Sequence, residues 1–356
     1  MKTYKHLYPQ IYTWETLEKA YRQARKGKRG NQGVADFEYA WESNLLRLQE
    51  ELFTKTYRPG PYHSFYIHDP KKRLISAAPF RDRVVHHALC LLIEPIFEAR
   101  FIHDSYANRV GQGTHRALDR CTYFARRYRY VLPCDIRQHF PSIDHAILRQ
   151  ILAKQIACSN TMWLIDQILA GGMGILSEEY ELVYFPGDDL LAATRPRGLP
   201  IGNLTSQFWS NCYLNPLDHF VKRDLKCPAF IRYVDDMLLF ADDKQTLQRW
   251  RAAIIDYLVN LRLVIHTEQS QPRPVSEGIP FLGFVVYPDY RRVKGRKVVG
   301  YRRRLKPLWQ AYRRGEIGPA EVMASVQGWL AHISHGDAWA LAEQTLQPIV
   351  FAGGQV

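Results

Sequence analysis

The sequence has few of the features that mark secreted, membrane-bound or zinc-containing proteins. Its 6 cysteines form no Cys-x-x-Cys pair, which argues against a zinc knuckle or a disulfide framework and favours a reducing compartment, the cytoplasm. No apolar run approaches the length of a transmembrane helix, and the N-terminus lacks the hydrophobic region of a signal peptide. Internal repeats and low-complexity tracts are also missing. We therefore expect a folded cytoplasmic protein.

What the sequence does have is length, apolar content and an excess of positive charge. Its 356 residues are 46% hydrophobic, which is enough for a large core divided over two or three subdomains. Lys and Arg number 48 against 35 Asp and Glu, and the formal net charge is +13. Such an excess suits a polyanionic partner such as nucleic acid, although basic proteins without that partner show it too.

Residues 231–241 contain two short apolar runs on either side of the adjacent acids Asp235 and Asp236. This pattern predicts a hairpin with the two acids at its tight turn. Asp pairs are common in solvated turns, but these flanks are apolar and Tyr233 stands two residues before the pair. Adjacent carboxylates repel each other and resist burial unless a cation neutralises them. The hairpin is therefore a candidate metal site.

A further acid, Asp135, ends an apolar stretch that starts at residue 130 and is followed by a turn with Phe140, Pro141 and Ser142. An acid at the end of a buried strand, next to two acids on a hairpin, has the right chemistry to hold two Mg²⁺ ions. Mg²⁺ favours one or two carboxylates together with substrate phosphates. Paired ions stabilise both the attacking and the leaving oxygen of a phosphoryl displacement.

Together the two stretches resemble motifs A and C of reverse transcriptases, with Tyr233-Val234-Asp235-Asp236 as the catalytic hairpin. The resemblance covers about residues 10–345. It implies an α+β right-hand polymerase with fingers, an antiparallel palm sheet and a short helical thumb. It also implies that Asp135, Asp235 and Asp236 are catalytic, and that these three residues and Ile136 bind two Mg²⁺ ions, for which Mn²⁺ can substitute. Ile136 is expected to contact the nucleotide as well.

The incoming nucleotide is expected to meet three further residues. Residues 62–76 alternate like a strand, turn at Asp69-Pro70 and carry Lys71, Lys72 and Arg73. A charged hairpin tip explains these cations too, but resemblance to the fingers motif implies that Arg73 and Lys71 bind the triphosphate. Phe140, five positions after Asp135, occupies the position of the family's steric gate against a ribose 2′-OH; an ordinary buried Phe is the alternative.

Residues 197–207 carry the signal for the subclass. Most bacterial retroelement polymerases that resemble this chain have Gln before the motif's second glycine and Ser-Pro at its end. This chain has Ile201 before Gly202, and Ser206-Gln207 at the end. That variant is similar to the polymerases of diversity-generating retroelements, which copy a template repeat with errors opposite adenine. Ile201, Gly202 and Gln207 are then nucleotide-binding residues, although Ile201 is also suited to brace a helix as an apolar residue.

The C-terminal part is expected to hold the primer and the duplex. Residues 281–284 match the primer-grip strand, with Leu282 and Gly283 at its centre. A basic loop over residues 291–297 precedes thumb helices at about 301–314, 319–334 and 337–347. Many reverse transcriptases have a Lys near Gln269 as a candidate general acid, a role that Gln cannot perform. No zinc-binding or endonuclease motif follows the thumb, so maturase and nuclease roles are not expected.

The local patterns also predict where helices and domains begin and end. Helices are expected at residues 14–24, capped by Thr13, and from Asp36 to 52, then at 84–97, 146–154 (capped by Asp144), 161–170, 202–222 and 246–261. Residues 171–186 read as a loop with a short strand pair. Arg109 and its neighbouring glycines are expected close to template or nucleotide. The predicted domains are the N-terminal region and fingers (1–130), the palm (131–290, with an insertion at 145–195) and the thumb (291–356).

We therefore expect an RNA-directed DNA polymerase of a diversity-generating retroelement. Its expected partners are the template RNA, the cDNA/RNA duplex, dNTPs and a small basic oligomeric accessory protein. One alternative is a related enzyme of a retron, a group II intron or a phage-defence system, which Ile201 and Ser206-Gln207 disfavour. Two others are a non-catalytic RNA-binding protein and a structural nucleoprotein, neither of which needs three acids in this pattern.

Overall fold

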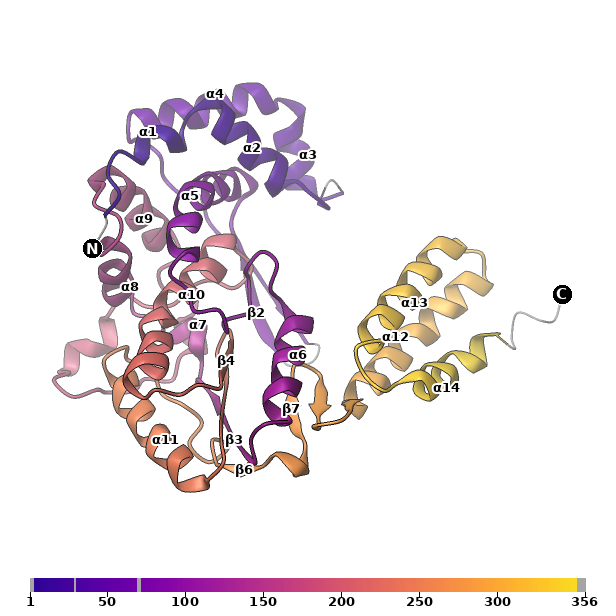
Figure 1. Cartoon of the computed structure of the whole chain (residues 1–356). Helices are drawn as coiled ribbons and strands as arrows, with labels where there is room; N and C mark the ends of the chain where they lie inside the picture. The colour runs from indigo at the N-terminus through magenta and orange to yellow at the C-terminus, as the bar shows by residue number, and fades with distance from the viewer. Residues whose placement is uncertain (1–2, 29, 69–71, 351–356) are drawn as a thin grey trace.

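The computed structural model describes residues 3–28, 30–68 and 72–350, apart from the side chains of residues 348–350. It has a layer of N-terminal helices, a central sheet with helices on both faces, and a helical lobe at the C-terminal end (Figure 1). This is the α+β right-hand polymerase fold with fingers, palm and a short helical thumb. In the described ranges no helix has both the length and the apolar content needed to cross a membrane.

Four helices at the N-terminus cover helix α5 (Phe80–Glu98): α1 (Tyr8–Ile11), α2 (Trp14–Ala24), α3 (Gln32–Tyr39) and α4 (Trp41–Phe53). Thr13 caps α2 as predicted, because its side chain accepts a hydrogen bond from the Thr16 N–H. The single helix expected from Asp36 to residue 52 is wrong. The chain leaves helical geometry at Ala40, and the break lets Phe37 and Trp41 both pack against the Tyr21 ring, at 5.8 and 5.5 Å.

The fingers hairpin consists of β1 (His63–Ile67) and β2 (Arg73–Ala77), which pair antiparallel from His63↔Ala77 to Ile67↔Arg73. Its predicted turn at Asp69-Pro70, and Lys71, lie outside the described residues. The side chains of Arg73, Ile75 and Ala77 fall on one face of this two-stranded sheet, because successive residues of a strand point to opposite faces.

The palm sheet has the strand order β4-β5-β3-β6. Its strands are β3 (Tyr130–Asp135), β4 (Phe230–Tyr233), β5 (Asp236–Ala241) and β6 (Arg273–Pro274), and all the pairings are antiparallel. Leu132 and Leu239 point into one apolar core, and Val131 and Phe240 into another. The sheet is therefore buried on both faces, which explains why its strands read as continuous apolar runs.

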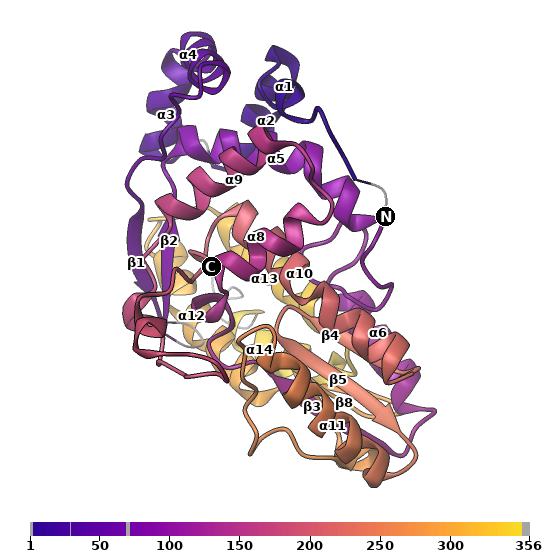
Figure 2. The same cartoon turned by 90° about the vertical axis from the view of Figure 1, so that its left-hand side faces the viewer.

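Helices α5, α10 (Leu204–His219) and α11 (Lys244–Val259) enclose the first of these cores (Figure 2). Helix α6 (Thr114–Ala125) covers the other face. The helix expected from Gly202 to residue 222 begins later, at Leu204, since Gly202 has φ +116° and is not helical. It then continues as a π-helical segment, η3 (Phe220–Asp224).

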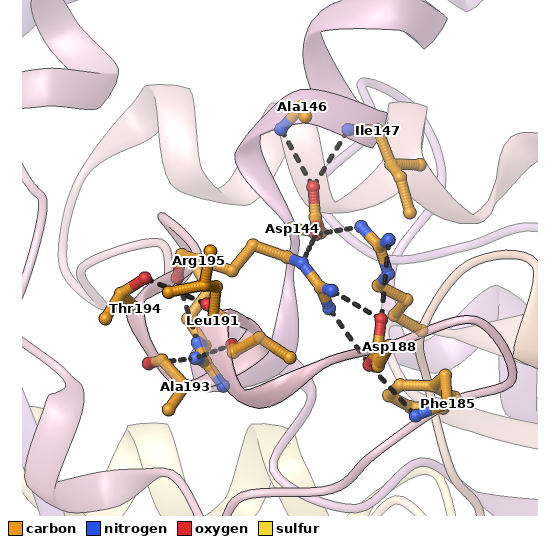
Figure 3. A network of polar contacts seen from close by, with 12 residues as sticks. Asp144, Ala146, Ile147, Phe185, Asp188, Leu191, Ala193, Thr194 and Arg195 are labelled. Carbon is orange, nitrogen blue, oxygen red and sulfur yellow. Dashed lines mark hydrogen bonds and ion pairs between the residues drawn. The ribbon is translucent and has the colours of Figure 1, made fainter.

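The segment between β3 and α10 contains α7 (His139–Ser142), α8 (His145–Ala153), α9 (Ser159–Gly171), η1 (Ser177–Glu179) and η2 (Leu190–Thr194). The short strand pair expected in residues 171–186 is not formed. Side chains hold this region instead, as Figure 3 shows. Asp144 caps α8 by accepting from the Ala146 and Ile147 N–H groups, at 2.9 and 3.0 Å.

The same Asp144 carboxylate accepts a hydrogen bond of 2.7 Å from Arg262, which follows α11. It also lies 3.6 Å from Arg195, which in turn pairs with Asp188. One buried carboxylate thus joins the N-terminus of α8, the loop before α10 and the end of α11 (Figure 3). This network replaces the backbone pairing that a hairpin would have supplied.

A three-stranded sheet, β7 (Ile279–Phe281), β8 (Phe284–Val286) and β9 (Arg291–Val293), follows η4 (Val275–Glu277) and leads into the thumb. The thumb helices α12 (Gly295–Arg313), α13 (Pro319–Ile333) and α14 (Trp339–Val350) enclose a core of their own, in which Tyr301 stacks on Trp329. The basic loop expected over residues 291–297 is wrong, because β9 and the first turn of α12 occupy it. The pairing of β9 with β8 accounts for the difference.

Candidate active site

The predicted catalytic hairpin is formed by β4 and β5, and its turn is one residue earlier than predicted. Tyr233 pairs with Asp236, so the two turn residues are Val234 and Asp235, while Asp236 is the first residue of β5. Val234 has φ +57°, an unfavourable backbone conformation for a β-branched residue. Strain of this kind is found where the surrounding structure fixes the turn firmly.

The three acids predicted to act together lie at the same end of the palm sheet. Asp135 ends β3 and is the cross-strand partner of Asp236, and Asp235 precedes Asp236 in the turn. Burial, followed by repulsion from Asp135 and Asp236, raises the pKa of Asp235 to about 7, and Arg73 partly offsets this rise. Burial and repulsion thus both disfavour the ionised form of Asp235, and a cation beside it would favour that form.

The donor set suits a hard divalent cation. Carboxylate and carbonyl oxygens are the ligands that Mg²⁺ takes, usually one or two from the protein with the rest from water and phosphate. Within the described ranges, no three acidic, His or Cys side chains converge closely enough to hold an ion by themselves. An ion held here would therefore need further oxygen ligands from water or from a phosphate-bearing substrate.

Ile136 was predicted to take part in metal and nucleotide binding, but its side chain is buried in the core and only 2% exposed. It forms an antiparallel bridge with Ile265. The hydrogen bonds that flank this bridge use the Asp135 carbonyl and the Arg137 N–H, at 2.9 and 2.8 Å. The Ile136 N–H and C=O therefore point to the other side, toward the hairpin. Any contact it makes there comes from its backbone.

A buried arginine that the sequence analysis missed holds the hairpin in place. Arg232 of β4 is fully buried and donates two hydrogen bonds of 2.7 Å to Asp218 of α10. Its remaining nitrogen donates to the Asn211 side chain and to the Val234 carbonyl, at 3.1 and 3.0 Å. The guanidinium thus holds the strained turn against α10. Breaking a buried pair of this kind by removing one partner costs about 3–5 kcal/mol.

Arg109 was expected close to the template or nucleotide, and the structure gives it another role. Its side chain is 7% exposed, pairs with Glu98 and donates to the Ile102 and Ser105 carbonyls, both at 2.7 Å. It therefore fixes the loop before α6. That loop meets β4, because the Tyr106 N–H donates to the Arg232 carbonyl.

Phe140 lies in the short helix α7, one residue after the buried His139. Burial lowers the pKa of His139 to about 3, so its ring is neutral, and its Nε2 lies 2.7 Å from the Ser210 hydroxyl. The Phe140 ring is half-buried, and its carbonyl accepts from the Leu199 N–H at 3.0 Å. The first contact fixes α7 against α10, and the second fixes it against the segment that contains Ile201.

The motif around Ile201 is fastened to the fingers strand β2. The Ile201 carbonyl accepts from the Ser76 N–H at 2.8 Å. Asn203 is buried; it donates to the Ser76 and Pro200 carbonyls and accepts from the Ala78 N–H. The sequence analysis gave Asn203 no role. It stands at the N-cap position of α10, but its side chain makes no capping hydrogen bond and holds β2 instead.

Gly202 and Gln207 are the other two predicted nucleotide-binding residues of the motif at residues 197–207. Two features favour glycine at position 202. A Cβ there would lie 3.1 Å from Ile75 Cγ2, and the backbone φ of +116° is one that other residues rarely adopt. Gln207 is exposed on the first turn of α10. Gly202 thus lets the motif approach the face of β2 that also carries Arg73.

Of the fingers cations, Arg73 is exposed at the start of β2 and lowers the pKa of Asp235, which places its charge near the acids. Lys72 lies 4.1 Å from the centre of the Tyr66 ring. Lys71 lies outside the described residues.

The predicted primer-grip residues Leu282 and Gly283 form the turn between β7 and β8, with φ +45° and +94°. The Gly283 carbonyl accepts from the Lys294 N–H at 3.0 Å. Burial lowers the pKa of Lys294, and Asp236 acts in the opposite direction, so this cation lies near the acids. The predicted basic loop included Lys294 without assigning it a role.

Comparison with known proteins identifies the family to which the chain belongs. A family model described as "Reverse transcriptase (RNA-dependent DNA polymerase)" matches residues 67–286. The chain therefore belongs to the reverse transcriptase family.

Individual relatives are more distant. Protein YkfC of Escherichia coli (strain K12) is 26% identical over 187 residues, which are 50% of this chain and 45% of that protein. The group II intron-encoded protein LtrA of Lactococcus lactis subsp. cremoris is 26% identical over 183 residues, 51% of this chain and 28% of that one. The chain thus spans less than half the length of these relatives. An apo telomerase structure from Candida tropicalis matches with a TM-score of 0.43 and 11% identity, over 65% of this chain and 48% of that one.

The raised pKa of Asp235 predicts a pH-dependent metal requirement. A proton and a metal ion compete for this carboxylate, and its pKa is about 7. The Mg²⁺ concentration for half-maximal nucleotide incorporation should therefore rise about tenfold per pH unit as the pH falls below 7, and level off above it. Titrations at fixed nucleotide concentration from pH 6 to 8 measure this. A requirement that stays constant over that range would contradict proton competition at Asp235.

Proposed function

We propose that this protein is an RNA-directed DNA polymerase that uses Asp135, Asp235 and Asp236 in phosphoryl transfer. The observation that carries the proposal is the gathering of these acids at one end of the palm sheet, where burial and mutual repulsion raise the pKa of Asp235. Membership of the reverse transcriptase family supports RNA as the template. We also propose the division into an N-terminal and fingers region (1–130), palm (131–290) and thumb (291–356).

The three carboxylates and the Ile136 carbonyl would hold two divalent ions, Mg²⁺ or alternatively Mn²⁺. Such ions neutralise charge on the phosphates and stabilise the attacking and leaving oxygens. Arg73, together with Lys71, would bind the triphosphate, and its charge already lies near Asp235. Leu282 and Gly283 would position the primer strand, since their turn lies next to Lys294 on the side of Asp236.

Within the family, we assign the chain to diversity-generating retroelements because of Ile201 and Ser206-Gln207. Its partners would then be a template-repeat RNA, the cDNA/RNA duplex, dNTPs and a small basic oligomeric accessory protein. The similarity to the group II intron-encoded protein LtrA favours a second candidate, an enzyme of group II intron type. Error counting on cDNA, described below for Ile201, separates the two.

The polymerase function is tested by Asp235→Asn. The exchange keeps the shape of the side chain but removes its charge, so incorporation of dNTPs on a primed RNA template should fall at least a hundredfold. The fold should remain intact, because the change relieves repulsion between neighbouring acids; thermal unfolding is the control. Extension close to that of the wild type by the folded variant would remove Asp235 from the active site.

The proposed steric gate is tested by Phe140→Ala. Loss of the ring should admit a ribose 2′-OH, so incorporation of ribonucleotides should rise at least tenfold relative to deoxynucleotides. Phe140 also packs against the core, and Phe→Ala costs about 3–5 kcal/mol at fully buried sites, so Phe140→Leu serves as a milder variant. The ratio of kcat/KM for the two nucleotides is the readout. An unchanged ratio in both active variants would leave Phe140 as a packing residue.

The role of Ile201 in copying errors is tested by Ile201→Gln. The hydrogen bond from Ile201 to β2 uses the Ile201 carbonyl, so the exchange should leave this bond intact. Gln adds a planar amide able to donate and accept hydrogen bonds beside the nascent base pair, and one positioning contact is worth about 1 kcal/mol. We expect a roughly fivefold drop in misincorporation opposite template adenine, counted per base by sequencing cDNA from the cognate RNA. The same adenine error rate in an active variant would exclude Ile201 from the mechanism.

A further inference from the structure

The outer face of helix α6 carries an open cavity of about 490 Å³. Helix α6 lies at the edge of the palm on the side of the thumb (Figure 1). Its inner face packs into the palm core through Leu118, Cys121 and Phe124. The cavity is lined from the opposite face of the helix and from β9, by Asp119, Thr122, Tyr123, Arg126, Arg127 and Arg291. None of the residues assigned to catalysis or nucleotide binding lines it.

The cavity lies toward the end of the palm sheet that is remote from the acids. Helix α6 begins near the catalytic hairpin, where Thr114 Oγ1 lies 3.1 Å from the Tyr233 hydroxyl. After the helix, the Arg129 N–H donates to Asp242 at the far end of β5. The strand pair runs from Asp135↔Asp236 to Tyr130↔Ala241, five residues or about 17 Å at the usual rise of ~3.4 Å per residue.

The charges around the cavity leave two arginines uncompensated. Asp119 is paired with Arg291, whose nitrogens lie 2.8 Å from the Asp119 carboxylate and 2.8 Å from the Thr122 hydroxyl. Arg126 donates through Nε to the Pro288 carbonyl at 2.7 Å, which fixes the guanidinium without neutralising it. Within the described parts of the chain, no carboxylate pairs with Arg126 or Arg127. An anionic ligand would supply the missing charge.

The Tyr123 ring lies close to two guanidinium groups, those of Arg120 and Arg127. Tyr123 is 39% exposed, with the Arg127 guanidinium carbon 4.0 Å and that of Arg120 5.0 Å from the ring centre. A guanidinium beside an exposed ring offers an unpaired base a surface for stacking, and its N–H groups can reach a phosphate. Alternating cations and aromatic rings are typical of surfaces that bind single-stranded nucleic acid. An acidic peptide would use the charges but not the stacking surface.

We propose that this cavity binds an unpaired segment of RNA outside the catalytic cleft. Phosphates contact Arg126 and Arg127, and a base stacks over the Tyr123–Arg127 pair. The site would anchor part of the RNA that carries the template while another part is copied. The inference rests on the proposed function only in taking RNA as the ligand, and it requires no catalytic step.

The test uses the full chain with Asp235→Asn, loaded with a short primer–template hybrid so that the cleft is filled. Binding of a labelled single-stranded RNA is then followed by fluorescence anisotropy at several salt concentrations. Arg126→Glu with Arg127→Glu should weaken binding at least tenfold and lower the slope of log K against log salt by about 1.4, for two phosphates of a single strand. Tyr123→Ala should weaken binding about tenfold at an unchanged slope.

A matched control changes the same amount of charge elsewhere. Lys19→Glu with Arg22→Glu alters two exposed cations on α2, in the N-terminal helical layer away from α6 (Figure 1), and should leave RNA binding unchanged. In the chain with Asp235 restored, the Arg126 and Arg127 variant should extend a short primer–template at the normal rate. These two results separate an anchoring site from a general effect of charge.

Three results would overturn the proposal. Unchanged RNA binding in the double variant would show that Arg126 and Arg127 are ordinary solvent-exposed residues that do not bind RNA. A parallel loss of primer extension would place them in the path of the duplex. Loss of binding to a polyglutamate probe, with RNA binding retained, would assign the cavity to an acidic protein. If the wild type lacks polymerase activity but binds RNA through Arg126 and Arg127, the proposed function fails and this inference stands.

Discussion

The buried ion pair between Arg232 and Asp218 is the interaction on which the geometry of the active site depends. One guanidinium joins β4 to α10, holds the Val234 carbonyl of the hairpin turn, and bonds to Asn211. Asn211 in turn donates to the Ala107 carbonyl in the loop before α6. The catalytic hairpin, the helix behind it and the loop beside it are therefore one hydrogen-bonded unit.

This unit explains how the chain keeps three acids together before any cation arrives. Repulsion among Asp135, Asp235 and Asp236 favours a turn that opens, and the positive φ of Val234 adds strain. The buried Arg232 guanidinium has five N–H donors in a rigid planar arrangement, which suits it to hold the turn against both the repulsion and the strain. Buried contacts inside the palm therefore stabilise a hairpin turn that would be unfavourable by itself.

Much of this site could be predicted from local patterns, because those patterns report local physics. Apolar runs ending in acids predict strands with carboxylates at one end, and Thr13 and Asp144 mark the starts of helices by their capping chemistry. The break at Ala40 was missed because distant aromatic packing on Tyr21 decides it. Arg232 and Asn203 were missed because their partners are distant in sequence. The mid-strand Arg232, in an otherwise apolar run, was the signal that a buried carboxylate had to exist elsewhere.

The contact between β2 and the segment before α10 has a consequence for how such polymerases diversify. Backbone groups of Ser76 and Ile201, with the side-chain amide of Asn203, make the hydrogen bonds of that joint, so none of these bonds depends on the side chain at position 201. With the role proposed for Ile201, the scaffold and the selectivity would be carried by different atoms of the same segment. A lineage can exchange the side chain at position 201 while these hydrogen bonds persist, so the substitution can occur in a single step with little cost to folding.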